Sequence, residues 1–138
     1  MANRVPPKLR SIAQQLLALE IAARKPADAA GATAFRVCEK LREPLGKIVG
    51  VAGFRSLLGR ALAVAGVEVS WLRALHIKAD GSLEGLKELE TDLDSRAIAE
   101  GEVVLSAHLI ELLVTFIGPA LTVRLLQDTW PKLGDISF

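Results

Sequence analysis

Few residues of this chain have the types and spacing that chemistry requires. His108 and Glu111 are three positions apart in a helical pattern, so one helix face carries both side chains, and a carboxylate there can orient an imidazole or share a metal ion with it. Dinuclear carboxylate bundles need two Glu-x-x-His motifs and two further glutamates, whereas this pair is single and in the reverse order. We therefore interpret the two residues as a buried polar pair without a metal.

The other motifs that could carry chemistry are incomplete. The glycine-rich segment 46–53 lacks the Lys-Ser/Thr end of a phosphate-binding loop, and residues 50–53 match an RNA-binding Gly-x-x-Gly clamp in spacing only. Cys38 has no histidine nearby in the sequence, and a calcium loop beginning at Asp92 would have Ala97 and Val103 where glycine and glutamate are required. We predict no enzyme activity, no catalytic residue, no metal and no cofactor.

The composition is that of one soluble globular domain. The chain has 138 residues, 51% of them apolar and 24% charged, and no low-complexity run, which excludes disordered, collagen-like and disulfide-rich classes. Its one cysteine, Cys38, cannot form an intramolecular disulfide, which suits a reducing compartment, so we expect a cytoplasmic protein. We predict a single helical domain over residues 1–131 and a C-terminal tail over residues 132–138.

Apolar residues recur at helical spacing along most of the chain, which predicts an all-α, single-domain bundle of about six helices. Prolines, glycines and capping residues set the expected ends. We expect a break at Pro44, because proline removes one backbone donor and clashes with the preceding turn. The expected helices cover residues 7–24, 28–43, 45–66, 82–93, 94–117 and 119–129.

Residues 67–83 fit two structures equally well. Trp71 and Leu72 fit a short helix capped by Ser70, whereas an Asp80-Gly81 turn fits a small hairpin or irregular loop near residues 75–83. A short helix is our preferred interpretation.

The most apolar segment extends from Val103 to Val123. It is long enough to span a membrane, but Glu111 would lie in mid-span at a cost of about 3 kcal/mol, and Gly118-Pro119 would interrupt the helix. We therefore favour a central helix of a soluble protein, apolar on nearly all sides because neighbouring helices or a second subunit surround it. The predicted interface residues are Leu109, Leu112, Leu113, Phe116, Leu121 and Leu125.

Charge is uneven along the chain although its sum is only +1. Residues 1–60 hold 11 basic and 4 acidic side chains, a net charge of +7, and residues 61–138 have a net charge of −6. Such a basic half can contact an anionic partner, or pack against the acidic half within the fold or across a dimer. The candidate anion-contacting residues are Arg36, Lys40, Arg42, Lys47, Arg55 and Arg60.

These patterns lead to two functional hypotheses. The first is a small soluble helical module for protein–protein interaction or regulation, self-associating as a homo-oligomer and without catalytic activity. The alternative is a nucleic-acid-binding regulator that uses the basic N-terminal half, although no recognition motif accompanies that charge. A third hypothesis, membrane association through residues 103–123, is less favoured than these two.

Overall fold

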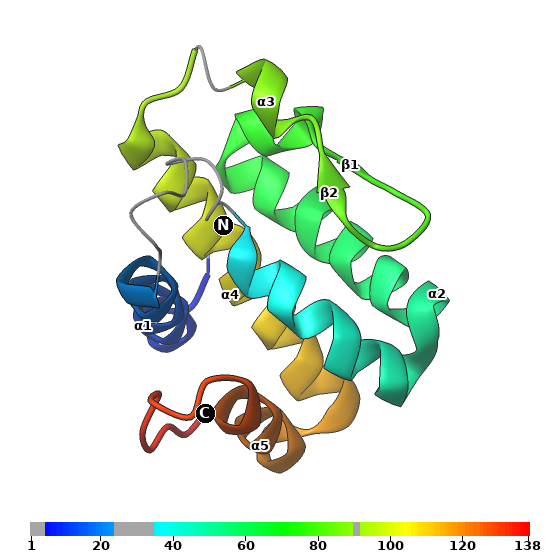
Figure 1. Ribbon diagram of the computed structural model, residues 1–138, viewed down its shortest axis with the longest axis vertical. Helices are drawn as coiled ribbons and strands as arrows, with labels where there is room; N and C mark the ends of the chain where they lie inside the picture. The colour runs from blue at the N-terminus through cyan, green and yellow to red at the C-terminus, as the bar shows by residue number, and fades with distance from the viewer. Residues whose placement is uncertain (1–4, 24–34, 90–91) are drawn as a thin grey trace.

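The computed structural model describes residues 5–23, 35–89 and 92–138 (Figure 1). Within these ranges the fold is all-α, as predicted, and its four long helices are α1 (Pro7–Ala23), α2 (Arg36–Glu68), α4 (Ser95–Ile117) and α5 (Pro119–Thr129). Between α2 and α4 lie the 3₁₀ helix η2 (Ser70–Ala74), strands β1 (His76–Ile77) and β2 (Leu83–Glu84), and the one-turn helix α3 (Leu86–Leu89).

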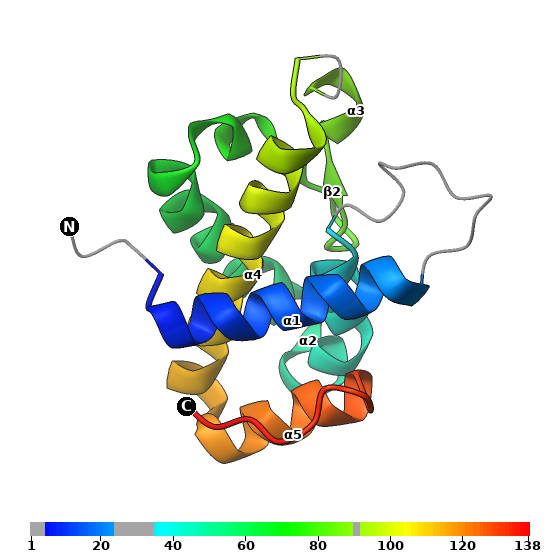
Figure 2. The same cartoon turned by 90° about the vertical axis from the view of Figure 1, so that its left-hand side faces the viewer.

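Helix α4 forms the centre of the molecule. The Asp94 side chain caps its first turn by accepting a hydrogen bond of 2.8 Å from the Ala97 N–H, and Gly118 ends it. Every residue from Gly101 to Ile110 is buried, because α1, α2 and α5 pack around the helix (Figures 1 and 2). The sequence prediction of a surrounded central helix is therefore confirmed, and the chain's own helices supply the surroundings.

The structure has four long helices where the sequence predicted about six. The expected helices 28–43 and 45–66 are joined in α2, and Pro44 lies inside that helix. Leu41 and Leu45, on either side of the proline, are both fully buried. Their packing offsets the backbone hydrogen bond that the proline lacks, so the helix continues through the expected break.

Helix α2 bends at Gly50 instead of Pro44. Gly50 has φ 79° and ψ 165°, a backbone conformation that glycine adopts far more readily than other residues. The bend changes the helical phase of the side chains that follow it. The expected start of the second helix near residue 28 lies outside the described residues.

Both structures considered for residues 67–83 occur, one after the other: Trp71 and Leu72 lie in a short helix, and a small hairpin follows it. The chain forms η2 and then an antiparallel hairpin, in which His76 pairs with Glu84 and Ile77 with Leu83. Asp80 closes the turn by accepting hydrogen bonds from the Ser82 N–H and hydroxyl. The expected helix 82–93 is reduced to α3 because strand β2 occupies residues 83–84.

The predicted C-terminal tail, residues 132–138, has no helix or strand but packs onto the core. Leu133 is buried, and Ile136 and Phe138 contact the core cluster. The Gln127 side chain donates a hydrogen bond of 2.9 Å to the Gly134 carbonyl, which holds the segment against α5.

Substitution of Gly101 by alanine should destabilise the protein by about 2 kcal/mol, because the new Cβ would lie inside van der Waals contact of the Trp71 ring. That ring is held in turn by an edge contact with Phe35, 6.2 Å between centroids. Denaturant titration measures the loss. Gly46→Ala is the matched control: nothing lies within 4 Å of its added Cβ, so the better helix propensity of alanine should stabilise α2 slightly. Equal changes in the two variants would contradict the packing argument.

Candidate functional site

The six predicted interface residues fall into two groups. Leu109, Leu113 and Leu125 are buried in the chain's own core and cannot contact a second molecule in this fold. Leu112 is half-buried. Phe116 and Leu121 are exposed, and Phe116 is the more exposed at 71%. The surface available to a partner is thus smaller than the sequence suggested, and it lies at the corner between α4 and α5.

A tight turn creates that corner. Gly118 ends α4 with φ 89°, Pro119 begins α5, and the Thr122 hydroxyl donates a hydrogen bond of 2.7 Å to the Gly118 carbonyl. Phe116 and Leu121 lie on either side of this turn. Residues 112–123 contain no charged side chain, so the outer surface of the corner is apolar.

The bend in α2 carries two exposed apolar residues that the sequence analysis did not assign to the surface. Ile48 and Val51 flank Gly50 and are exposed, and residues 48–54 also lack charge. Helix α2 contacts α5, and both views place its bend at the α5 end of the molecule (Figures 1 and 2). Ile48 fitted an inward position of a regular helix, and Gly50 was the signal that the regularity ends there. Val51, however, lines a pocket with Arg42, Lys47 and Asp80, so these two residues are kept apart from the corner. We call Leu112, Phe116 and Leu121 the corner patch.

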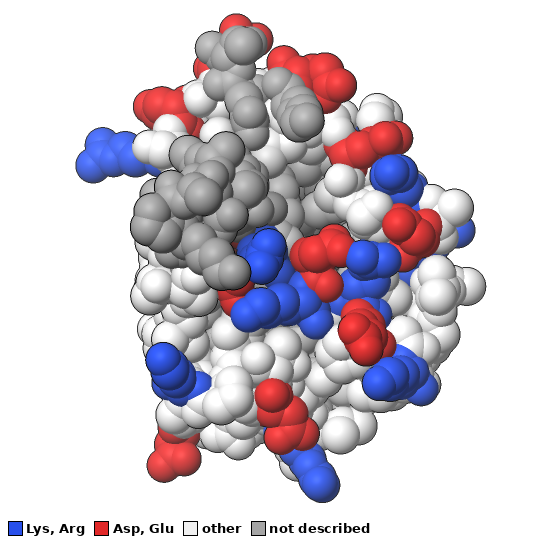
Figure 3. Space-filling model, viewed as in Figure 1, with Lys and Arg blue, Asp and Glu red and all other residues white. Residues whose placement is uncertain are grey.

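The candidate anion-contacting residues do not form a continuous basic surface. Lys and Arg side chains are interleaved with Asp and Glu on the face that carries the first half of α2 (Figure 3). Arg36 and Lys40 pair with Glu20, and Lys47 lies 3.8 Å from Glu43. Arg55 and Arg60 are exposed and have no ion pair with the described residues. Three of these five cations therefore already have an acidic partner within the chain, and two of these three share Glu20.

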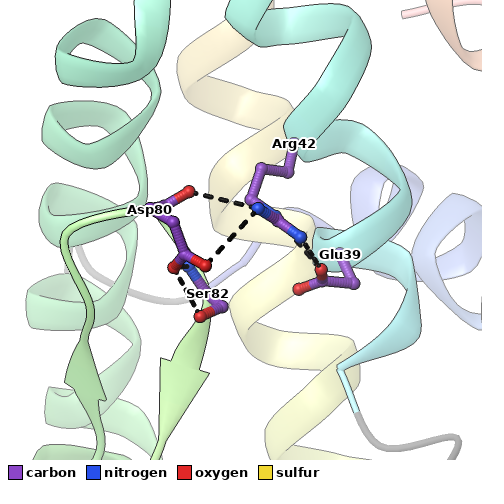
Figure 4. Close-up of polar contacts among 4 residues, drawn as sticks. All are labelled: Glu39, Arg42, Asp80 and Ser82. Carbon is purple, nitrogen blue, oxygen red and sulfur yellow. Dashed lines mark hydrogen bonds and ion pairs between the residues drawn. The ribbon is translucent and has the colours of Figure 1, made fainter.

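Arg42 connects α2 to the hairpin (Figure 4). Its Nε donates a hydrogen bond of 3.1 Å to Glu39 Oε1, and its Nη1 donates one of 3.3 Å to the Asp80 carbonyl. The hydrogen bond with Glu39 is the main cause that raises the pKa of Arg42, and the hydrogen bonds from Ser82 lower the pKa of Asp80. This network fixes the hairpin turn and leaves the guanidinium of Arg42 occupied.

A buried carboxylate, Glu20, ties three parts of the chain together. It is 3% exposed, and its Oε2 lies 2.6 Å from Lys40 Nζ and accepts a hydrogen bond of 2.8 Å from Trp130 Nε1. Arg36 Nε lies 3.6 Å from the other oxygen. The sequence analysis gave Glu20 no role, although its position four residues after Leu16 on the apolar face of α1 was a signal that it needed a buried partner.

A second buried carboxylate, Glu102, lies at the start of α2. Burial raises its pKa to about 7, against hydrogen bonds from the backbone N–H groups of Phe35, Arg36 and Val37 that lower it. Burial also raises the pKa of Cys38 to about 12, and the charge of Glu102 adds to that effect. The Cys38 thiol, which lines a cavity of about 170 Å³, is therefore neutral and a poor nucleophile.

His108 and Glu111 lie together, with His108 Nδ1 3.7 Å from Glu111 Oε1, but they are not the buried pair that was predicted: His108 is buried, whereas the Glu111 side chain is 45% exposed. That distance is longer than a hydrogen bond. Glu68, at the end of α2, lies 3.7 Å from the other ring nitrogen, a partner that the sequence could not identify because it is 40 positions away. Within the described ranges, no three histidine, cysteine or acidic side chains are grouped so as to hold a metal ion.

Helix length and composition single out α2 in one further respect. Among the described residues, α2 is the helix whose length and apolar composition would allow it to cross a membrane. In its most apolar 18-residue stretch, 28% of the residues are buried. Residues 103–123, which the sequence analysis considered as a span, are divided between α4 and α5.

No family model matches the chain, and no curated protein or solved structure is significantly similar to it.

Proposed function

We propose that the protein is a non-catalytic helical interaction module that self-associates through the corner patch. The exposure of Phe116 carries this proposal. The chain has four phenylalanines, two tryptophans and no tyrosine, and the five aromatic side chains other than Phe116 are all buried or half-buried. Burial of one phenylalanine side chain is worth about 2 kcal/mol or more, so its exposure at 71% leaves that free energy for a partner.

A second copy of this chain is the occupant that the patch fits best. A twofold interface brings the same patch of both subunits together, so a charged patch would meet its own charge, whereas an apolar patch is complementary to itself. Segment 112–123, which forms the corner patch, carries no charge. The net charge of the whole chain is +1, so two copies repel each other little at long range.

Substitution of Phe116 by glutamate should weaken self-association at least tenfold, because a twofold interface would place two carboxylates against apolar surface at its centre. Light scattering over a dilution series measures the molar mass. We expect the wild-type chain to exceed 14.8 kDa at micromolar concentration and Phe116→Glu to approach that monomer mass.

Val67→Glu is the matched control for this experiment. Val67 is also an exposed apolar residue of a helix, at 56%, but lies 17 residues after Gly50 in α2, roughly 25 Å along the helix axis. The Val67→Glu variant should have the same molar mass in light scattering as the wild-type chain. A wild-type chain that is a monomer at high micromolar concentration, with no change on dilution, would overturn the proposal. If that monomer instead sediments with neutral lipid vesicles and Phe116→Glu does not, the patch binds lipid and not a second copy.

A further inference from the structure

The bend of α2 protrudes from the molecule. Residues 47, 48, 50, 51 and 52 are all exposed, and Val49 among them is half-buried. A helix that lies flat on a core exposes one face, whereas here nearly every residue of a whole turn is exposed. Figures 1 and 2 place the bend at the edge of the molecule, on the side away from α1. Its large apolar side chains, Ile48 and Val51, are 45% and 55% exposed.

Core packing does not account for the apolar character of this part of α2. In the most apolar 18-residue stretch of the helix, 28% of the residues are buried. In α4, by contrast, every residue from Gly101 to Ile110 is buried. Apolar side chains that the fold leaves uncovered on a protrusion are typical of a contact site.

The charged residues that accompany the bend are all of one sign. Residues 44–67 contain three cations, Lys47, Arg55 and Arg60, and no acidic residue. All three cations are exposed. This part of α2 therefore combines uncovered apolar side chains with positive charge, which favours an anionic partner that also has an apolar interior.

Two of the cations lie beside the exposed apolar side chains. Arg55 follows Val51 by one helical turn and so lies on the same face, and Lys47 and Val51 line one cavity. Glu43 lies 3.8 Å from Lys47, but both side chains are highly exposed and such a pair contributes little. The cavity is lined by three acids and three cations of the described residues, so it adds no net charge. We call Lys47, Ile48, Val51 and Arg55 the bend patch.

We propose that the bend patch is a contact site for a membrane surface that contains anionic phospholipid. Ile48 and Val51 enter the boundary between headgroups and acyl chains, and Lys47 and Arg55 lie against the lipid phosphates. This contact goes beyond the self-association proposed above and uses different residues.

Two other occupants fit the bend patch less well. A twofold contact with a second copy would place its cations against the same cations of the partner. A nucleic acid would use the cations, but the aliphatic side chains of Ile48 and Val51 offer its bases no aromatic ring for stacking. Only a lipid surface uses both halves of the patch.

The experiment measures sedimentation of the full chain with vesicles of phosphatidylcholine alone and of phosphatidylcholine mixed with phosphatidylserine. We expect binding to the mixed vesicles that weakens as salt is added, because salt screens the attraction. Val51→Glu should weaken this binding at least tenfold, since the anionic headgroups repel the new carboxylate. Arg55→Gln should weaken it about fivefold, the contribution of one cation at an anionic surface.

Val67→Glu is the matched control. Val67 is exposed to the same extent, 56%, and lies in the same helix, but it follows Val51 by 16 residues, about 24 Å along the axis. The two variants change the net charge of the chain equally. Val67→Glu should nevertheless bind the mixed vesicles almost as the wild-type chain does.

Three results would overturn the proposal. The first is a wild-type chain that does not sediment with the mixed vesicles, which decides the question even if Val51→Glu fails to fold; binding of single-stranded DNA by that chain would assign the cations to nucleic acid instead. The second is an equal loss in Val51→Glu and Val67→Glu, which would reflect net charge alone. The third is a loss in Phe116→Glu with none in Val51→Glu, because the lipid would then bind the corner patch.

Discussion

Replacement of Lys40 by methionine should lower the free energy of unfolding by about 3 kcal/mol. Glu20 would remain buried at 3% exposure with the Trp130 N–H at 2.8 Å, and its nearest cation would be Arg36 at 3.6 Å. Methionine keeps the aliphatic stem of the lysine beside the Trp130 ring, so the loss reports the missing charge and not missing volume. Urea or guanidinium denaturation at neutral pH measures it.

Two further variants identify the cause of that loss. Lys47→Met removes a cation from a pair whose side chains are 76% and 84% exposed, and it should change stability by less than about 0.5 kcal/mol. The double variant Glu20→Leu with Lys40→Met removes both charges and should recover much of the loss, because no unpaired charge stays buried. If Lys40→Met and Lys47→Met prove equally stable, the Glu20 cluster does not hold the three segments together as argued above.

Truncation of Phe54 to alanine should have the largest effect of any substitution considered, about 4 kcal/mol. Phe54 is 1% exposed and heads the fully buried side chains by volume. Its ring also lies directly beneath the hairpin turn, since a Cβ added at Gly81 would lie 2.9 Å from Phe54 Cδ2. The alanine variant therefore leaves a cavity in the core and removes the ring against which the hairpin turn packs. Thermal or chemical denaturation followed by circular dichroism measures the total loss.

A second substitution separates these two contributions. Gly81→Ala leaves Phe54 in place but strains the turn, because Gly81 has φ 91° and an added Cβ would press on the ring. We expect it to destabilise the chain by less than Phe54→Ala and to leave the helical signal unchanged. A loss below 1 kcal/mol for Phe54→Ala would show that the neighbouring side chains collapse into the space, and the packing described here would need revision.

Local signals in the sequence were sufficient for three of the four long helices. Pro7 begins α1, Asp94 caps α4, and Gly118-Pro119 divides α4 from α5, and these ends agree with the expected ranges within one residue. Each signal acts through backbone groups only a few positions away. Pro44 shows where such reasoning fails, because its cost to the helix was predictable and the burial of Leu41 and Leu45 that outweighs this cost was not.

The candidate site was predictable only in part, for a related reason. Apolar residues on nearly all sides of α4 showed that other helices must pack around it. Apolar periodicity does not show whether those helices belong to the same chain or to a second subunit. Leu109 and Leu113 were therefore assigned to an interface and lie in the core. The buried carboxylates depend on contacts between distant positions: Glu20 and Trp130 are 110 residues apart, and no local rule connects them.

The central position of α4 has a consequence for biosynthesis. α1 ends at Ala23 and α4 begins at Ser95, so at a synthesis rate of about 5–20 residues per second the ribosome needs roughly 4 to 14 s to make the chain between them. Throughout that interval α1 and α2 have no α4 to cover their apolar faces. The nascent chain therefore exposes apolar surface until its last third has been synthesised.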